Sequence, residues 1–428
     1  MSAITDELQA EYDRLNADQK KAVDTLDGPV LVVAGPGTGK TQLLALRAVN
    51  ILREKDVSPA NILCLTYTDA GVRAMTSRLI KFIGRDAYGI PVSTFHSLAS
   101  SLRSQYPEYF ARGPFSKLIT SLQAAQLVDR LLKELPIGDS LPQNIHNGVH
   151  GGLNAMKDFI TSFKHSGLKP EQLRAIMQQN LGYLEFLTQK TEFFALVNKG
   201  TGGTAKKKRE VLAELEDLVA RAPSLAPSEL TRPLVTTPGI YTPYAAHLER
   251  LFAQTELIEP EGGKTTGFQD LRRRLLEKDD DGEWCAFRDV AVCAKALSAL
   301  GVYERYQEYL SDNGLHDYDD MILDALAAIE GSPRLKGILQ EQYRYIQVDE
   351  FQDTNGVQMR LVDLLTDANP LPNVLVVGDD DQAIMRFQGA SVEYIRQFEG
   401  HYSRVCRCVL KTNYRSTPSL VELGQTVA

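Results

Sequence analysis

Two adjacent carboxylates follow a short apolar stretch late in the chain. Residues 345–348 predict a strand, and Asp349 and Glu350 come directly after it in the segment VDEFQDTN. A carboxylate at the end of a strand can hold the water shell of Mg²⁺, and a second one can orient an attacking water. The pair therefore predicts a hydrolytic site, and such a site needs phosphates to act on.

A glycine-rich loop near the start of the chain can hold those phosphates. The apolar run 30–33 breaks into AGPGTGKT and then into a helical pattern. Glycines let successive N–H groups point inward, Lys40 can reach the terminal phosphates, and Thr41 offers a hydroxyl to the metal. The alternative is an incidental glycine turn, and Ala34 stands where the motif usually begins with glycine. The predicted cofactor-binding residues of this loop, for ATP with Mg²⁺, are Gly35, Gly37, Thr38, Gly39, Lys40 and Thr41.

Three further segments carry residues suited to a nucleotide site. Gln19 in LNADQ can offer a donor and an acceptor to an adenine edge, although a surface glutamine on an opening helix is an alternative. Gln382 in GDDDQ can sense the terminal phosphate. Arg415 in LKTNYRST can contact the γ-phosphate as an arginine finger, and Tyr414 can stack on the base of the nucleotide.

Hydroxyls and aromatic rings at other strand ends suit a single-stranded nucleic acid. Thr66 and Tyr67 follow one predicted strand, and Phe95 and His96 follow another. Hydroxyls can bind phosphates while rings stack on bases, and Phe387 is a further stacking candidate. The alternatives are a partly buried imidazole for His96 and core packing for Phe387.

The order of elements predicts an α/β fold. Short apolar strands alternate with helical patterns, which favours a parallel sheet covered on both faces. Ligands bind at the carboxyl ends of the strands in such sheets, where almost all these motifs lie. Helical periodicity dominates between about 106 and 290, which predicts a large, mainly helical inserted subdomain. The strand patterns lie at 30–34, 62–66, 91–94, 345–348 and 374–377.

Length and composition are those of a large globular protein. The 428 residues and 43% hydrophobic content imply roughly two to four domains with real cores. No apolar run approaches the ~18 residues of a membrane helix, and the acidic amino terminus lacks a signal-peptide core. We expect a cytoplasmic protein without a membrane partner.

Cysteine and histidine usage predicts free thiols and no structural metal. Five cysteines are an odd number and lack a paired CxxC spacing. His146 and His150 lie four apart without the glutamate of HExxH, and the glycines around them indicate a loop.

The charge of the chain does not by itself indicate a polyanion partner. The formal net charge is −8. Two basic clusters, 206–209 and 272–274, can meet backbone phosphates, or can belong to solvated helix faces.

The order of the motifs resembles the superfamily 1 DNA helicases of the UvrD, Rep and PcrA type. The resemblance is specific in residues 15–100 and 300–418 and weak in between. It implies an ATP-driven motor that tracks 3′ to 5′ along single-stranded DNA and separates duplexes, with a RecA-like P-loop sheet. The segments that carry it are LNADQ, AGPGTGKT, LTYTDAGVRAM, VSTFHSLA, HDYDDM, VDEFQDTNGVQ, VGDDDQAIMRFQGA and LKTNYRST.

The resemblance also implies roles for individual residues. Gln19 would read adenine, Lys40 and Thr41 would hold phosphate and Mg²⁺, Asp349 would bind the metal, and Glu350 would activate water. Gln382 and Arg415 would sense the γ-phosphate. The DNA-facing residues would be Tyr67, Phe95, His96 and Phe387.

The resemblance implies domains and partners as well. Residues 1–105 and 291–400 would form the first motor domain, 106–290 the inserted subdomain, and 401–428 the start of a second motor domain whose remainder is absent. The expected partners are single-stranded DNA and junctions between single-stranded and duplex DNA. We expect a monomer or weak self-association.

Three positions depart from the family pattern. Gln42 stands where the family usually has an arginine that packs on the base, and Met385 and Gln388 stand where it has tyrosine and arginine. An oriented cation near the transferring phosphoryl group can be worth orders of magnitude in rate. Two alternatives stay open: a nucleotide-gated DNA-binding or regulatory module without motor activity, and the motor part of a helicase fused to a nuclease. For this chain alone we expect little turnover.

Overall fold

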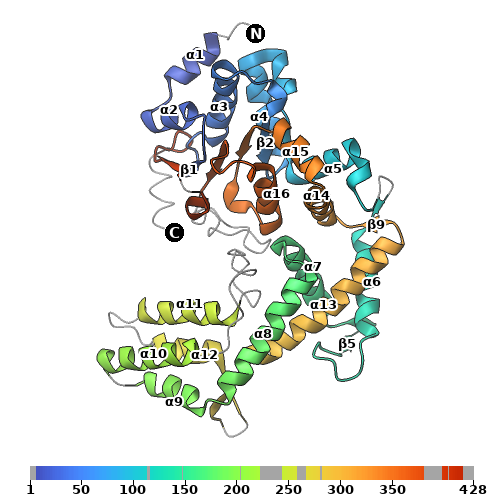
Figure 1. Cartoon of the computed structure of the whole chain (residues 1–428), viewed down its shortest axis with the longest axis vertical. Helices are drawn as coiled ribbons and strands as arrows, with labels where there is room; N and C mark the ends of the chain where they lie inside the picture. The colour runs from blue at the N-terminus through green and yellow to red at the C-terminus, as the bar shows by residue number, and fades with distance from the viewer. Residues whose placement is uncertain are drawn as a thin grey trace. The chain divides into compact units, whose positions relative to one another are not determined.

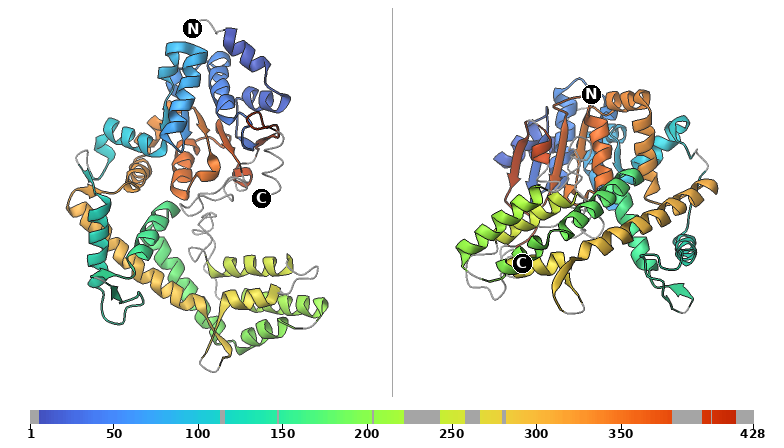
Figure 2. Two further views of the ribbon diagram at one scale, coloured as in Figure 1. Left: turned by 180° about the vertical axis from the view of Figure 1, so that it is seen from behind. Right: turned by 60° about the horizontal axis from the view of Figure 1, so that its bottom comes forward.

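The computed structural model describes most of the chain (Figures 1 and 2). The described residues are 6–112, 116–146, 148–202, 204–221, 243–257, 267–279, 282–379, 398–402 and 404–417. Gln382, Met385, Phe387 and Gln388 lie outside them.

The chain divides into two compact units. Unit 1 comprises Met1–Ile119, Thr161–Gly167 and Asn313–Ala428, and unit 2 comprises Thr120–Ile160 and Leu168–Asp312. Unit 2 begins at Thr120 and ends at Asp312, so both of its boundaries lie later in the chain than those of the helical insert that we expected at 106–290.

Unit 1 is built on a six-stranded parallel sheet with the order β12-β1-β11-β10-β2-β3. The five strands that we predicted are present, which confirms the predicted α/β class. The additional strand β12 lies at one edge and pairs with β1, so the segment expected to open a second motor domain contributes to the first sheet. The strands are β1 Val30–Ala34, β2 Ile62–Thr66, β3 Val92–Thr94, β10 Tyr345–Val348, β11 Val374–Gly378 and β12 Cys406–Leu410.

Both faces of this sheet are buried. Side chains alternate between the faces of a strand. Val30 and Val32 pack into a cluster with helices α2, α3 and α4, while Leu31 between them is also buried. Continuous apolar strands are typical of parallel sheets with helices on both faces, and helices flank this sheet in Figures 1 and 2.

Side-chain caps begin several helices of unit 1 at the motif residues. Thr68 accepts a hydrogen bond from the Gly71 amide to start α4, and Thr94 accepts one from the Ser97 amide to start α5. Such caps satisfy amides that have no partner within the helix. The helices are α1 Asp6–Asp13, α2 Ala17–Asp24, α3 Lys40–Glu54, α4 Asp69–Ile83, α5 Phe95–Gln105, α14 Asp320–Gly331, α15 Pro333–Gln342 and α16 Gly356–Thr366, with 3₁₀ turns η1 Pro59–Asn61, η2 Gly84–Gly89, η3 Pro107–Tyr109 and η4 Phe351–Asp353; a two-stranded sheet pairs β4 Lys117–Leu118 with β9 Leu315–His316.

Unit 2 is mainly helical, as the periodicity predicted. His146 and His150 lie on a short hairpin, β5 and β6, and α7 continues in sequence from unit 2 into unit 1. No helix among the described residues combines the length and hydropathy that crossing a bilayer requires. The elements are α6 Ser121–Lys133, β5 Ile145–His146, β6 Val149–His150, α7 Leu153–Ser166, α8 Pro170–Thr188, α9 Thr191–Gly200, α10 Ala205–Ala220, α11 Tyr244–Leu257, α12 Gly267–Leu275, β7 Leu276–Lys278, β8 Trp284–Phe287 and α13 Arg288–Asp312.

Candidate nucleotide site and nucleic-acid interface

The glycine-rich loop connects β1 to the start of α3. Gly37 and Gly39 have φ values of 72° and 86°, a conformation that glycine adopts readily and other residues rarely. The Thr38 hydroxyl donates to the Gly35 carbonyl at 2.8 Å and closes the loop. The loop leads directly into the amino terminus of a 15-residue helix, where free amides and the helix dipole favour an anion.

The acidic pair lies against this loop. The Lys40 ammonium donates to Glu350 Oε2 at 2.7 Å, and the Thr41 hydroxyl donates to Asp349 Oδ2 at 3.5 Å. Glu350 is the one non-glycine residue with positive φ in the described part of the chain, at 49°. Strain of this kind clusters at functional sites. Two segments 308 positions apart in sequence therefore meet at one edge of the sheet.

The environment of Asp349 suits a cation. This side chain is buried, and burial followed by the charge of Glu350 raises its pKa to about 6, while Lys40 acts in the opposite direction. Oxygen ligands at neighbouring corners of a Mg²⁺ octahedron lie about 3 Å apart, close to the separation of the Thr41 and Asp349 oxygens. Mg²⁺ in nucleotide sites takes one or two protein ligands plus phosphates, so this small donor set fits it. No group of three or more His, Cys, Asp or Glu in the described residues could hold a metal ion.

Gln352 holds Glu350 in place, a role that the sequence did not reveal. Its amide donates to Glu350 Oε2 at 2.7 Å and accepts from the Asp379 amide at 3.0 Å. The side chain is only 2% exposed. Gln352 therefore links the acidic pair to the residue that follows β11.

Gln19 lies beside the loop but is already bonded to it. Its side-chain nitrogen donates to the Thr38 carbonyl at 3.0 Å, and its side-chain oxygen accepts from the Asn16 amide at 3.0 Å. The second bond belongs to a capping box that begins α2. The donor of this amide thus supports the loop and the acceptor supports the start of α2, and adenine recognition stays a prediction.

The segment after β12 packs on the glycine loop. The Tyr414 amide donates to the Gly37 carbonyl at 2.9 Å, and the Asn413 side chain accepts from the amides of Arg415 and Ser416. Tyr414 is 60% exposed, and its hydroxyl accepts from the Asn16 side chain at 3.0 Å. The contact brings Tyr414 and Arg415 to the phosphate loop, and it depends on Asn413, which we had not singled out; their nucleotide contacts stay predictions.

Gln42 has a structural partner. Its side chain donates to Glu11 Oε2 at 2.5 Å and so ties α3 to α1. Gln42 stands where the family has an arginine, and in this chain it contributes to packing between α1 and α3.

Tyr67, His96 and Tyr318 come from three neighbouring segments of unit 1. The rings of His96 and Tyr318 are stacked, with centroids 3.9 Å apart, and Tyr318 is 57% exposed. Thr66 pairs with Thr94 in the sheet, so Tyr67 and His96 follow neighbouring strands. Burial, then the charges of Asp353 and Asp319, raise the pKa of Tyr67. Nε2 of His96 is buried with no hydrogen-bond partner among the described atoms, and burial lowers the pKa of this imidazole. Tyr318 lies in HDYDDM but had no role in our sequence analysis.

Two expected DNA-facing residues do not fit that role. Phe95 is 3% exposed and Thr66 is 4% exposed. A Cβ added at Gly71 would lie 2.2 Å from the Thr66 hydroxyl, so α4 covers this side chain. Phe95 is the first residue of α5 and is buried in the core. Both assignments are corrected to structural roles.

The basic cluster on α12 is partly engaged in packing. Arg272 lies over the ring of Trp284 at 5.0 Å and donates to the Asn198 side chain, and Arg274 pairs with Asp270. These arginines therefore stabilise unit 2.

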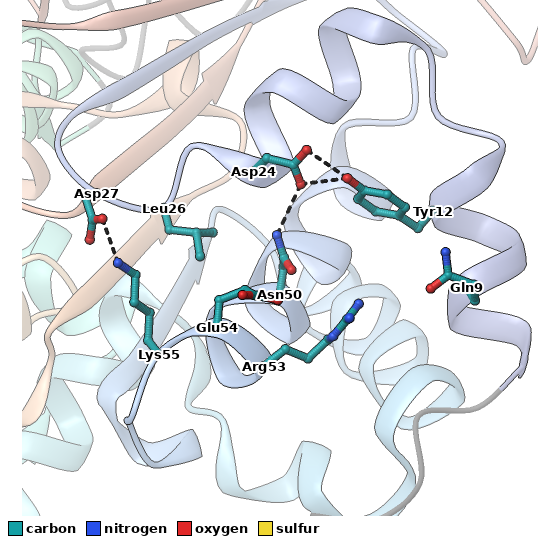
Figure 3. Close-up of a pocket in the computed structure, with 9 residues that line it drawn as sticks. All are labelled: Gln9, Tyr12, Asp24, Leu26, Asp27, Asn50, Arg53, Glu54 and Lys55. Carbon is teal, nitrogen blue, oxygen red and sulfur yellow. Dashed lines mark hydrogen bonds and ion pairs between the residues drawn. The ribbon is translucent and has the colours of Figure 1, made fainter.

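A polar hollow of about 540 Å³ lies at the opposite end of α3 from the glycine loop, ~20 Å away along the helix (Figure 3). Two of its acidic side chains are already bonded: Asp24 accepts from the Tyr12 hydroxyl and the Asn50 amide, and Asp27 pairs with Lys55. These bonds tie α1 and α2 to α3, so we interpret the hollow as structural.

Comparison with known proteins identifies the family of this chain. The family model of the UvrD/REP helicase N-terminal domain matches residues 15–227 and 293–403. The ATP-dependent DNA helicase PcrA of Staphylococcus epidermidis is 26% identical over 420 residues, and PcrA of Staphylococcus aureus is 25% identical over the same length. Each match covers 98% of this chain and 40% of the relative, so the chain spans about 40% of the length of these relatives. Because the family model covers well over half of the chain, the chain belongs to the UvrD/REP helicase N-terminal domain family.

Proposed function

We propose that this chain is the ATP- and DNA-binding portion of a DNA helicase that moves 3′ to 5′ along single-stranded DNA. The observation that carries the proposal is the contact of Lys40 and Thr41 with Glu350 and Asp349. Unit 1 would be the first motor domain and unit 2 its inserted subdomain.

The residues divide the work of hydrolysis. When ATP binds, the Lys40 ammonium leaves Glu350 and contacts the terminal phosphate. It neutralises the negative charge of that phosphate. Glu350, held by Gln352, then accepts a proton from the attacking water. Thr41 and Asp349 would hold Mg²⁺, which neutralises charge on the phosphate oxygens. Arg415, placed beside Gly37, would contact the γ-phosphate, and Gln382 would sense it.

Hydrolysis tests this assignment. In the full-length protein, single-stranded DNA should stimulate ATP hydrolysis. Glu350→Gln should lower the rate of ATP hydrolysis by roughly 10²- to 10⁴-fold, which is the usual contribution of a general base. Binding of an ATP analogue should persist in this variant because the glycine loop and Lys40 are intact. Absence of stimulation by DNA, with Glu350→Gln unchanged, would instead favour the DNA-binding module without motor activity. Displacement of streptavidin from either end of biotinylated DNA reports the direction of movement.

We propose that the stack of His96 and Tyr318, with Tyr67 beside it, receives bases of the single strand. An exposed ring backed by a second ring is a rigid platform, and stacking is worth about 1–3 kcal/mol per base. Tyr318→Ala should therefore weaken binding of oligo-dT by about 5- to 100-fold in fluorescence anisotropy, whereas Tyr318→Phe should retain it. Tyr88, 74% exposed on η2, offers a matched control. Equal effects of Tyr88→Ala and Tyr318→Ala would refute the platform.

A further inference from the structure

The exposed ring of the base platform belongs to a short acidic turn, residues 317–320. Tyr318 is 57% exposed, whereas Asp320 is buried and the two other aspartates of the turn are partly buried. The Asp320 amide donates to Asp317 Oδ1 at 3.0 Å, and the Asp317 amide donates to Asp320 Oδ2 at 2.9 Å. These reciprocal bonds fix the backbone on both sides of Tyr318.

Lys164 holds the two ends of this turn together. Its side chain is completely buried, and its ammonium donates to Asp317 Oδ2 and, at 2.6 Å, to Asp320 Oδ1. Arg112 adds a second cation 3.0 Å from Asp320 Oδ2. Each carboxylate at the ends of the turn therefore has a cationic partner as well as a backbone amide, which favours a single arrangement of the turn.

His165 holds the aspartate that follows the ring. Its Nε2 lies 3.0 Å from Asp319 Oδ1. Burial acts to raise the pKa of Asp319, but the hydrogen bond from His165 and the charge of His165 keep that pKa below its ordinary value. The Asp319 carboxylate is therefore ionised, and it is fixed one position from Tyr318.

Both of these partners come from the end of α7. Residues 161–167 of the chain belong to unit 1, as does the acidic turn. Replacement of buried ion pairs by apolar residues is often neutral or stabilising, so the geometry that such pairs impose explains them better than stability does. In this unit, that geometry is the stack of Tyr318 on His96, whose ring centroids lie 3.9 Å apart.

We propose that Lys164 and His165 are positioning residues of the base platform. They hold the acidic turn so that Tyr318 stacks on His96 before a base arrives, and they act through Tyr318. A ring that is already ordered binds without the entropy cost of ordering a side chain, which corresponds to about 2- to 12-fold in affinity. The inference rests on the proposed binding of single-stranded DNA by this platform.

A double-mutant cycle tests the proposal in fluorescence anisotropy with oligo-dT. His165→Leu should weaken binding by about 2- to 12-fold in the original chain. In the Tyr318→Ala background it should weaken binding by less than about 1.5-fold, because its effect passes through the missing ring. His165→Gln, whose side-chain nitrogen can donate to Asp319, should retain most of the affinity. Lys164→Met should act in the same direction, and if this variant of a buried residue fails to fold, the cycle at His165 carries the test.

His401 offers a matched control in the same unit. Its Nε2 lies 3.4 Å from Asp363 Oδ1, so it also pairs with an aspartate, but this aspartate belongs to α16. His401→Leu should change the affinity for oligo-dT by less than about 1.5-fold in both backgrounds. Nucleotide affinity should be the same in His165→Leu and His401→Leu.

Motion of the ring in the absence of DNA provides a second readout. The whole chain contains one tryptophan, Trp284, so the double substitution Trp284→Phe and Tyr318→Trp leaves a single indole at position 318. Time-resolved fluorescence anisotropy should show a larger amplitude of fast local motion when His165→Leu is added, and no change when His401→Leu is added.

Two results would overturn the proposal. One is an equal loss of oligo-dT affinity from His165→Leu with and without Tyr318, which would indicate a general structural effect. The other is unchanged affinity together with unchanged motion at position 318. If Tyr318→Ala leaves the affinity unchanged while His165→Leu still increases the motion, the DNA-binding role of the platform fails and the positioning of Tyr318 stands.

Discussion

Replacing Gly37 by alanine should damage the nucleotide site through a contact made late in the chain. Gly37 has φ of 72°, which costs a residue with a side chain about 1–2 kcal/mol. The added Cβ would lie 2.5 Å from Asn413 Oδ1 and 2.7 Å from Arg415 Cβ, distances that real atoms do not tolerate. The segment 413–415 must therefore move away, which breaks the bond from the Tyr414 amide to the Gly37 carbonyl, worth about 0.5–1.5 kcal/mol.

The two contributions sum to about 1.5–3.5 kcal/mol, and this cost must be seen in one of two measurements. If the loop keeps its shape, the free energy of unfolding in urea falls by that amount. If the loop relaxes, binding of a fluorescent ATP analogue must restore its shape, and the affinity for the analogue falls by roughly 10- to 300-fold. Hydrogen exchange at the Tyr414 amide should accelerate in either case.

Gly35→Ala is the matched control. The nearest atom to a Cβ at Gly35 is Thr38 Cγ2 at 4.0 Å, an ordinary contact, and Gly35 is not among the glycines with positive φ. This variant should change stability by less than about 0.5 kcal/mol. The reasoning is refuted if Gly37→Ala matches Gly35→Ala in unfolding, in nucleotide affinity and in exchange at Tyr414.

Three other substitutions test the site and its supports. Lys40→Ala should reduce affinity for the ATP analogue at least 100-fold in calorimetric titration, with an unfolding free energy within about 1 kcal/mol of the original, because Gln352 still holds Glu350. Arg47→Met should cost about 1–3 kcal/mol in urea unfolding, because it leaves the Thr25 and Leu26 carbonyls without the guanidinium donor; burial lowers the pKa of Arg47 to about 10. Burial raises the pKa of Asp324 to about 6, although the positive charge of Arg112 acts in the opposite direction. The folded state therefore binds more protons than the unfolded state between about pH 4 and 6. As a result, the free energy of unfolding falls as the pH rises through that window. Asp324→Asn should reduce that fall by up to about 3 kcal/mol, and an unchanged pH profile of urea unfolding would contradict this account.

The sequence alone determined the features that depend on neighbouring residues. Five strands of the sheet, the glycine loop before α3 and the acidic pair after β10 each follow from a local pattern, because strand, turn and helix preferences act over a few positions. The order of these elements also predicted that their carboxyl ends meet at one edge of the sheet.

Tertiary structure alone decided which side chains meet and which are covered. Phe95 and Thr66 were assigned to DNA because they lie at strand ends, but α4 covers Thr66, and Phe95, the first residue of α5, is buried in the core. His96 stacks on Tyr318, and Asn413 packs on Gly37. The residues of each pair are more than 200 positions apart in the sequence, and no local pattern specifies such pairs. Motif residues are recognised by their type and spacing, so the sequence identified the chemistry. Burial depends on the packing of the whole unit, so only the fold determined which of these residues can perform that chemistry.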